Sequence, residues 1–273
     1  MNGVDKLTNL NKHLKVVDLV FEVVDARCPF TSRSRQVKQL IKDKRSLLVL
    51  NKLDLADPNI TADWVKYYAD QGKRALPVDA LRGKGMAGVR ESLNQETQVL
   101  NRLLREKGRR NRPLRVAILG IPNTGKSSFL NKLLGKRAVL RGDRPGITKG
   151  PQWVHLQGTI SVLDTPGLLS PHLKDEEDLF KLAVIRAADP ERLDQVDLGE
   201  QLLKFLKIHY PDALIRHLGI TGTTSTLESV AGEKNFLSTD GEYDLQRTAV
   251  FILGSYNKGK LGRISLEAPI NIA

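Results

Sequence analysis

The segment ILGIPNTGKSSFLNKLLG, residues 118–135, matches the pattern G-x-x-x-x-G-K-S between an apolar run and a stretch with helical spacing. In such a loop the glycines let backbone amides turn inward around an anion, and the N-terminus of the following helix adds a favourable field. Lys126 is then placed to neutralise phosphate oxygens, Ser127 to bind Mg²⁺ and Ser128 to donate to the α-phosphate. The segment predicts a phosphate-binding loop, with contacts from Asn123, Thr124, Gly125, Lys126, Ser127 and Ser128.

Two later segments carry residues that suit a terminal phosphate and its metal ion. Asp164 in SVLDTPG ends an apolar run, where a carboxylate binds Mg²⁺ through water, and Gly167 is placed for its amide to meet the γ-phosphate. Thr148 in GDRPGIT is a candidate to close over Mg²⁺ and the γ-phosphate as a switch. Either segment alone would also fit an ordinary turn. Because both follow a phosphate loop, we predict the metal ligands Ser127, Thr148 and Asp164.

The tetrapeptide NKLD follows the apolar run SLLVL, well before the phosphate loop. The Asp54 carboxylate can accept hydrogen bonds from N1–H and the exocyclic amine of guanine, a donor pair that adenine lacks. Asn51 is expected to brace the loop or contact the base, and the stem of Lys52 to cover the ring. The segment PVDALRGKG resembles a second base-contacting segment, S-A-L-x-G-x-G. Asp79 takes the serine position there, and the Ala80 amide can serve the base oxygen.

The order of these motifs along the chain is NKLD, DAL, GIPNTGKS, GIT and DTPG. This is the order found in the circularly permuted GTPases. The segments VVDARCPF, GDRPGIT and GKLGRISLE, together with the motifs above, resemble the ribosome biogenesis GTPase A family over nearly the whole chain. Permutation requires only a new connection between termini that lie close together on a domain surface. The stretch Gly88–Pro113 is expected to supply that connection.

The resemblance implies an enzyme that binds GTP and GDP with Mg²⁺ and hydrolyses GTP during assembly of the large ribosomal subunit. It also implies contacts with rRNA that involve the C-terminal part of the chain. The catalytic residues it implies are Lys126, Thr148, Gly167 and Asn123, the last as a candidate K⁺ ligand.

Leu168 occupies the position where Ras-type GTPases have their water-orienting glutamine. The Pro-Gly-His-Met segment with which family members usually begin is absent from MNGVDKLTNLNKHLK. We therefore expect slow hydrolysis by the protein alone and stimulation by ribosomal particles. The open alternatives are a weakly catalytic, GTP-dependent RNA-binding placeholder and, less favoured because of NKLD and DAL, a P-loop kinase or ATPase.

Alternating apolar runs and helical stretches predict an α/β domain, 1–174, with a mostly parallel sheet flanked by helices. In it, TADWVKYYADQG is expected to be a helix capped by Thr61. A smaller, mainly helical domain, 175–273, is expected to follow and to bind rRNA. In this domain we expect strand character in one apolar run, RTAVFILGSYNKGKLGRISLE, residues 247–267.

The net charge of +12 is unevenly distributed. Residues 1–174 contain 32 Lys and Arg against 15 Asp and Glu, whereas residues 175–273 contain 11 against 16. A basic surface favours a polyanionic partner, so we expect most of the attraction to rRNA from the first part, through Arg102–Arg115 and Lys132–Arg144. A local C-terminal patch would consist of Lys258, Lys260 and Arg263.

The remaining composition narrows the class of protein. No run approaches the length of a membrane span, and no apolar signal core opens the chain. The lone Cys28 excludes an internal disulfide, which suits a reducing compartment. We expect a cytoplasmic protein that is a monomer off the ribosome and binds neither membrane nor DNA.

Overall fold

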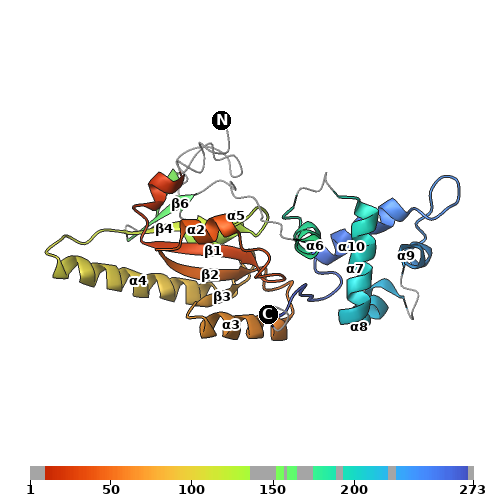
Figure 1. The fold of residues 1–273 in the computed structure, drawn as a ribbon, viewed down its shortest axis with the longest axis horizontal. Helices are drawn as coiled ribbons and strands as arrows, with labels where there is room; N and C mark the ends of the chain where they lie inside the picture. The colour runs from red at the N-terminus through yellow and green to blue at the C-terminus, as the bar shows by residue number, and fades with distance from the viewer. Residues whose placement is uncertain are drawn as a thin grey trace.

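The computed structural model describes residues 10–135, 152–156, 159–164, 175–188, 193–220 and 226–269. Within them, six strands form one sheet in the order β3-β2-β1-β4-β6-β5 (Figure 1). β5 is antiparallel to β6, and the other neighbours are parallel. The strands are β1 (Leu19–Asp25), β2 (Arg45–Asn51), β3 (Ala75–Val78), β4 (Leu114–Leu119), β5 (Gln152–Leu156) and β6 (Ile160–Asp164).

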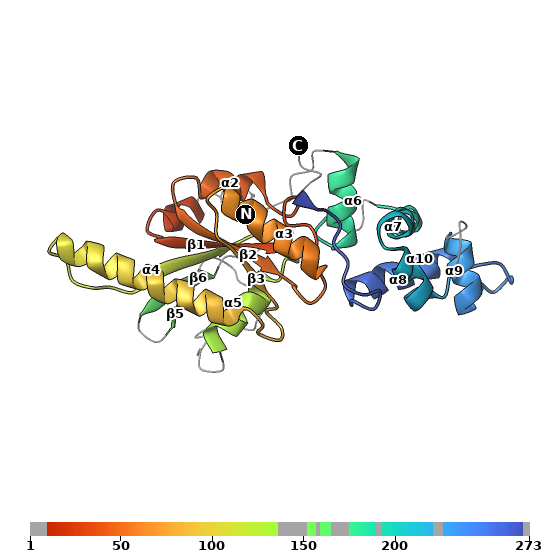
Figure 2. The same ribbon diagram turned by 90° about the horizontal axis from the view of Figure 1, so that it is seen from below.

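Helices cover both faces of this sheet (Figures 1 and 2). They are α2 (Arg35–Leu40), α3 (Pro58–Asp70), α4 (Met86–Glu106) and α5 (Lys126–Leu134). Side chains alternate between the faces of a strand, so Phe21 and Val23 of β1 pack with α4 and α5, whereas Val20 and Val24 face the side of α2 and α3. Every residue of β1 is buried, as expected for a central parallel strand. The predicted α/β class with a mostly parallel sheet is confirmed.

A second core lies among the helices that follow the sheet. These are α6 (Glu176–Val184), α7 (Gln195–His209), the short α8 (Pro211–Ala213) with a π-helical turn η3 (Leu214–Leu218), α9 (Leu227–Lys234) and α10 (Leu245–Asn257). Figure 1 shows them side by side beyond one end of the sheet. Two residues of the first part, Cys28 and Ile121, are buried in this second core. The predicted mainly helical C-terminal region is therefore present.

Two local expectations were wrong. The first part of the run with strand character, residues 247–257, lies in helix α10, because Asp244 caps this helix and its buried residues recur at helical spacing, as in Ala249, Ile252 and Tyr256. Residues 258–267 follow the helix without forming a strand. Helix α3 begins at Pro58, before Thr61, because the Asp57 carboxylate accepts from the amides of the first turn.

The division of the chain at residue 174 stays a prediction, but the last described residues bear on it. The segment 263–267 returns from α10 to the loops of the sheet, where the Leu266 amide donates to the Arg27 carbonyl at 2.7 Å. The helical region thus begins after β6 and ends against β1 and β2.

Among the described residues, none of the helices is long and apolar enough to cross a membrane. The same residues contain no group of three or more His, Cys, Asp or Glu side chains that could hold a metal ion by themselves.

Phe129 tests the core between the sheet and α5. It is fully buried, and its ring lies edge-on to that of Phe21 with centroids 5.4 Å apart. Phe129→Ala should lower the free energy of unfolding by about 3–5 kcal/mol, through lost burial and the cavity left behind. Urea unfolding followed by circular dichroism measures this.

Leu103→Ala is the control for Phe129→Ala. Its side chain lies on α4 and is 44% exposed, so the change should stay within about 0.5 kcal/mol. Equal losses in the two variants would contradict the packing described.

Candidate nucleotide-binding site

Three loops meet at one edge of the sheet. β2 ends at Asn51, β3 at Val78 and β4 at Leu119, and the register of the parallel strands brings these ends together. The carboxyl edge of a parallel sheet is where α/β folds bind ligands. The predicted base-reading and phosphate-binding segments therefore share one site.

The phosphate loop has a backbone that only its residue types permit. Gly120 packs so closely on β1 that a Cβ there would lie 2.2 Å from the Val23 carbonyl oxygen. Asn123 and Gly125 have left-handed φ values of 61° and 88°, a conformation in which glycine and asparagine are enriched. This brings the loop to the N-terminus of α5, where backbone amides can bind an anion.

Polar side chains of the loop are engaged with its own backbone. The buried Thr124 hydroxyl donates to the Ile121 carbonyl at 3.1 Å, and the Lys126 ammonium donates to the same carbonyl at 2.6 Å. Ser127 and Ser128 lie in the first turn of α5. Lys126 thus lies over the loop, where a phosphate would attract it.

Asn51 joins the base-reading and phosphate-binding parts. Its Nδ2 donates to the Thr124 carbonyl at 2.9 Å, and its Oδ1 accepts from the Ala80 amide at 3.1 Å. The side chain is 2% exposed, so its hydrogen bonds are not shared with bulk water. Of the two roles expected for Asn51, this geometry supports bracing. The Ala80 amide, expected at the base oxygen, here donates to Asn51.

Asp79 shapes the second base-contacting segment. Its Oδ1 accepts from the amides of Leu81 and Arg82 at 3.0 and 2.9 Å, and its amide donates to the Lys84 carbonyl. These bonds hold a tight turn. The buried carboxylate accepts hydrogen bonds from the backbone amides of the turn, as a serine hydroxyl at this position can also do. A contact of Asp79 with a base stays a prediction.

The Asp54 carboxylate lies at the surface of the site and is 21% exposed. Its Oδ2 accepts from the Arg82 guanidinium at 2.6 Å, and Arg82 itself is 71% exposed. An ion pair this open to water is screened by the solvent and contributes little to stability. Recognition of guanine by Asp54 stays a prediction, and it would require the carboxylate to exchange Arg82 for the two donors of the base.

Lys52 forms an ion pair with the buried carboxylate of Asp25. Its backbone is left-handed, with φ 63°, and its ammonium lies 2.9 Å from Oδ2 of Asp25 at the end of β1. The same carboxylate receives Nε and Nη2 of Arg27, each at 2.9 Å. Burial alone would raise the pKa of Asp25, but the charges of Arg27 and Lys52 outweigh it and hold that pKa well below its usual range.

Two contacts with the helical region were not foreseen. The Asn123 amide donates to the carbonyl of Arg186, a residue after α6 whose φ is 61°. The adjacent Ile121 is buried in the helical core. The apolar residue at position 121 is a weak signal of this packing, and nothing in the local sequence indicates the acceptor at Arg186.

Several predicted residues lie outside the described part of the structure. These are Thr148, Gly167 and Leu168. Asp164 closes β6, and its backbone pairs with Gln152 of β5. Its position at a strand end agrees with the expectation, and its role as a metal ligand stays a prediction.

Comparison with known proteins places this geometry in a family. A family model described as "50S ribosome-binding GTPase" matches residues 115–209. Ribosome biogenesis GTPase A of Priestia megaterium is 35% identical over 265 residues, which cover 95% of this chain and 92% of that protein. The chain belongs to the ribosome biogenesis GTPase A family. The protein of the same description from Thermotoga maritima is 34% identical over 260 residues, with 95% and 89% of the two chains covered.

A solved structure agrees with this assignment. The crystal structure of GNP-bound YlqF from T. maritima superposes with a TM-score of 0.67 at 30% identity, covering 97% of this chain and 98% of the other. Family membership makes the chain a GTP-binding protein and a GTPase, and its motif order is that of a circularly permuted one.

Asn51→Ala should separate the loops that Asn51 joins. It removes two hydrogen bonds of a buried side chain, each contributing about 0.5–1.5 kcal/mol, and leaves the Thr124 carbonyl and the Ala80 amide without it. The dissociation constant for fluorescent GDP should rise roughly 5- to 150-fold in an equilibrium titration. The exposed Asn59→Ala should match the unaltered protein, and equal affinity of both variants would refute the bracing role.

Proposed function

We propose that this protein is a GTP-hydrolysing factor for assembly of the large ribosomal subunit, switched by GTP and GDP with Mg²⁺. The observation that carries the proposal is the Asn51 side chain, which joins the base-reading loop to the phosphate loop. The relatives named ribosome biogenesis GTPase A support the assembly role. The large subunit and its rRNA as the partners go beyond those names.

In the proposed site each residue has one task. Asp54 accepts from guanine, with Lys52 over the ring and Ala80 beside the base oxygen once the nucleotide is bound. Backbone amides of the phosphate loop and Lys126 bind the phosphates. The hydroxyls of Ser127 and Thr148, with Asp164 through water, would hold Mg²⁺, and the Gly167 amide would meet the γ-phosphate. Bound Mg²⁺ supplies positive charge for the phosphate oxygens.

Asn123 is proposed to bind K⁺ through its amide oxygen. Its nitrogen is already used, because it donates to the Arg186 carbonyl. That bond orients the amide, so the oxygen is the atom available to a cation. A cation near the phosphates would offset charge that develops during transfer, the task of an arginine in other GTPases. Because Leu168 cannot orient water, hydrolysis should be slow until a ribosomal particle binds.

The weakly catalytic placeholder is the second candidate, and Leu168 is the residue that favours it. The relatives are named as GTPases, which supports hydrolysis instead. Single-turnover hydrolysis with and without large ribosomal subunits separates the two. Stimulation by the subunits supports the proposal, whereas a rate that stays at the level of the unbound protein supports the placeholder.

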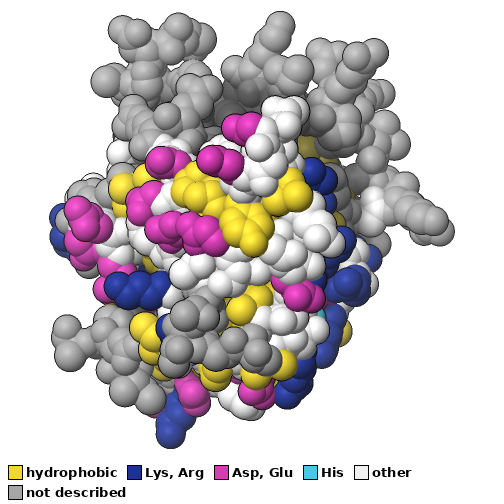
Figure 3. Space-filling model, turned by 90° about the vertical axis from the view of Figure 1, so that its right-hand side faces the viewer, with side chains coloured by type: hydrophobic (Ala, Val, Ile, Leu, Met, Phe, Trp, Pro, Cys, Tyr) yellow, Lys and Arg dark blue, Asp and Glu magenta, His cyan; other side chains and the backbone are white. Residues whose placement is uncertain are grey.

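The proposed rRNA contact lies on the projecting end of α4. This helix extends past the sheet (Figure 2). The exposed cations of this end are Arg102, Arg105, Lys107, Arg109 and Arg110. Arg112 differs from them because it forms two 2.7 Å bonds with Asp18. By contrast, Figure 3 shows acidic side chains gathered beside hydrophobic ones over part of the far end of the helical region, with Lys and Arg along its right-hand edge, and the acidic part suits a polyanion poorly.

Asp54→Asn tests guanine recognition. The amide of the new side chain can donate to the 2-oxo group of xanthine but cannot accept from both donors of guanine. We expect affinity for GDP to fall by about two orders of magnitude or more and affinity for xanthosine diphosphate to rise. Competition against a fluorescent nucleotide measures both. Asp63→Asn, an exposed change on α3, should keep the original preference, and an unchanged preference in Asp54→Asn would exclude this role.

Arg109 and Arg110 test the RNA contact in a charge-matched pair of variants. Replacing both by Gln should flatten the dependence of large-subunit binding on KCl, with the log–log slope falling by about 0.7–0.9 for each cation that contacts a phosphate. Replacing the exposed Lys258 and Lys260 by Gln should change the slope less. The opposite ranking would assign the contact to the helical region.

A further inference from the structure

The segment 259–267 crosses from α10 back to the base-reading loop (Figure 1). Gly259 passes so close to that loop that a Cβ there would lie 2.8 Å from Cδ2 of Leu55. The Ile264 amide donates to the Leu55 carbonyl at 2.9 Å. Two parts of the chain, some 200 residues apart in sequence, thus lie against each other directly beside Asp54.

Arg263 binds the backbone on both sides of Asp54. Its Nη2 donates to the Leu53 carbonyl and its Nε to the Ala56 carbonyl, each at 2.8 Å. One acceptor directly precedes Asp54 in the chain and the other follows it by two residues. A planar guanidinium with fixed donor directions can hold two carbonyls at a set separation, which a single ammonium cannot do.

The loop also has restraints within its own part of the chain. The Leu53 amide donates to the Val78 carbonyl at 3.1 Å, and the Leu55 amide donates to the Lys52 carbonyl at 2.9 Å. Lys52 itself is in the left-handed region, at φ 63°, which is unfavourable for a residue with a Cβ. The bonds from Arg263 add to these restraints and to the ion pair of Lys52 with Asp25, and they act on the carbonyls on both sides of Asp54.

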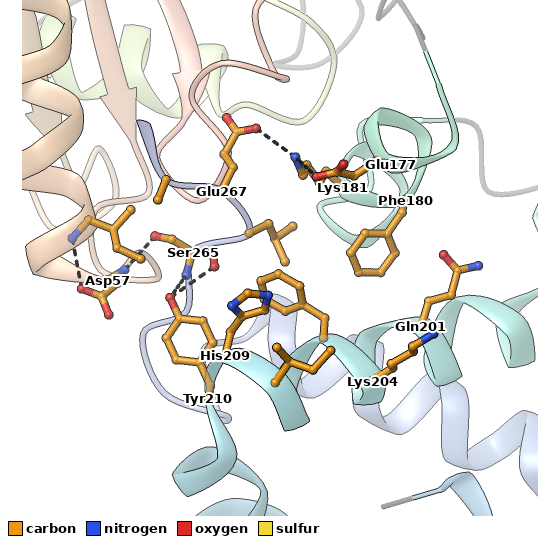
Figure 4. Close-up of a pocket in the computed structure, with 15 residues that line it drawn as sticks. Asp57, Glu177, Phe180, Lys181, Gln201, Lys204, His209, Tyr210, Ser265 and Glu267 are labelled. Carbon is orange, nitrogen blue, oxygen red and sulfur yellow. Dashed lines mark hydrogen bonds and ion pairs between the residues drawn. The ribbon is translucent and has the colours of Figure 1, made fainter. Parts of the chain in front are cut away.

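The segment that carries Arg263 is itself anchored. Ser265 exchanges hydrogen bonds with the Tyr210 hydroxyl and accepts from the Asp57 amide at 3.1 Å (Figure 4). The buried Glu267 carboxylate accepts from the amide and the hydroxyl of Thr31. Arg263 thus extends from a fixed segment, so its contacts can impose a position on the loop.

We propose that Arg263 is a positioning residue for guanine selection, which holds the loop so that Asp54 meets both donors of the base. This rests on the proposed function, in which Asp54 reads guanine. It gives Arg263 a role apart from the basic C-terminal patch predicted for rRNA, and it makes the end of the helical region a component of the nucleotide site.

The test compares three nucleotides. Inosine diphosphate lacks the exocyclic amine of guanine but keeps N1–H, so the ratio of GDP to inosine diphosphate affinity reports the second hydrogen bond to Asp54. In Arg263→Met we expect GDP affinity and this ratio each to fall at least about fivefold. Arg263→Lys keeps the positive charge but not the planar pair of donors, so its ratio should lie between those of the unaltered protein and Arg263→Met. ADP affinity should not change.

Lys260→Met is the matched control, because it removes one positive charge from an exposed side chain of the same segment. It should leave the ratio unchanged, and all variants should keep the thermal unfolding midpoint measured without nucleotide. In an Asp54→Asn background, Arg263→Met should have no further effect on the ratio.

Equal ratios in Arg263→Met and Lys260→Met would overturn the proposal. If Arg263→Met does not fold, Arg263→Lys decides by the same ratio, and a ratio equal to that of the unaltered protein sinks the idea. A parent protein that does not prefer GDP to ADP would instead refute the proposed function, so the two failures are distinguishable.

Discussion

The whole nucleotide site depends on one buried amide. Asn51 donates to the phosphate loop and accepts from the Ala80 amide, so each loop fixes the others. A Cβ at Gly125 would lie 2.2 Å from Nδ2 of Asn51. A larger residue at position 125 would therefore clash with the Asn51 side chain. In a permuted chain the hydrogen bond from Asn51 to the phosphate loop is especially important, because the base-reading and phosphate-binding segments are otherwise connected only through the long helix α4 and the residues around it.

A second constraint lies at the end of β1. Asp25 is shared by Arg27 and Lys52, and the Arg27 guanidinium lies 4.8 Å from the centre of the Tyr256 ring on α10. Removing either cation would leave the buried Asp25 carboxylate partly unpaired and would lower the stability of the folded protein. The end of β1 therefore contacts both the base-reading loop, through Lys52, and the helical region, through Arg27. A change in the position of one is expected to affect the other.

The sequence predicted what depends on short-range pattern. The glycines around Lys126, the apolar runs of β1 and β2 and the order NKLD before GIPNTGKS were enough for the fold and for the family. It did not predict contacts that depend on distant segments, such as Asn123 with Arg186 or Arg263 with Leu53, since no spacing encodes them. The assignment of α10 as a strand failed because a short apolar run fits either element until its cap, Asp244, is considered.

The return of 263–267 to the sheet changes what kind of attachment the helical region has. Besides the chain before α6, the 263–267 segment and the contacts of Cys28, Ile121 and Arg27 join it to the sheet region. A single cut in the chain before α6 would leave these contacts in place, so release of the helical region would require them to open as well.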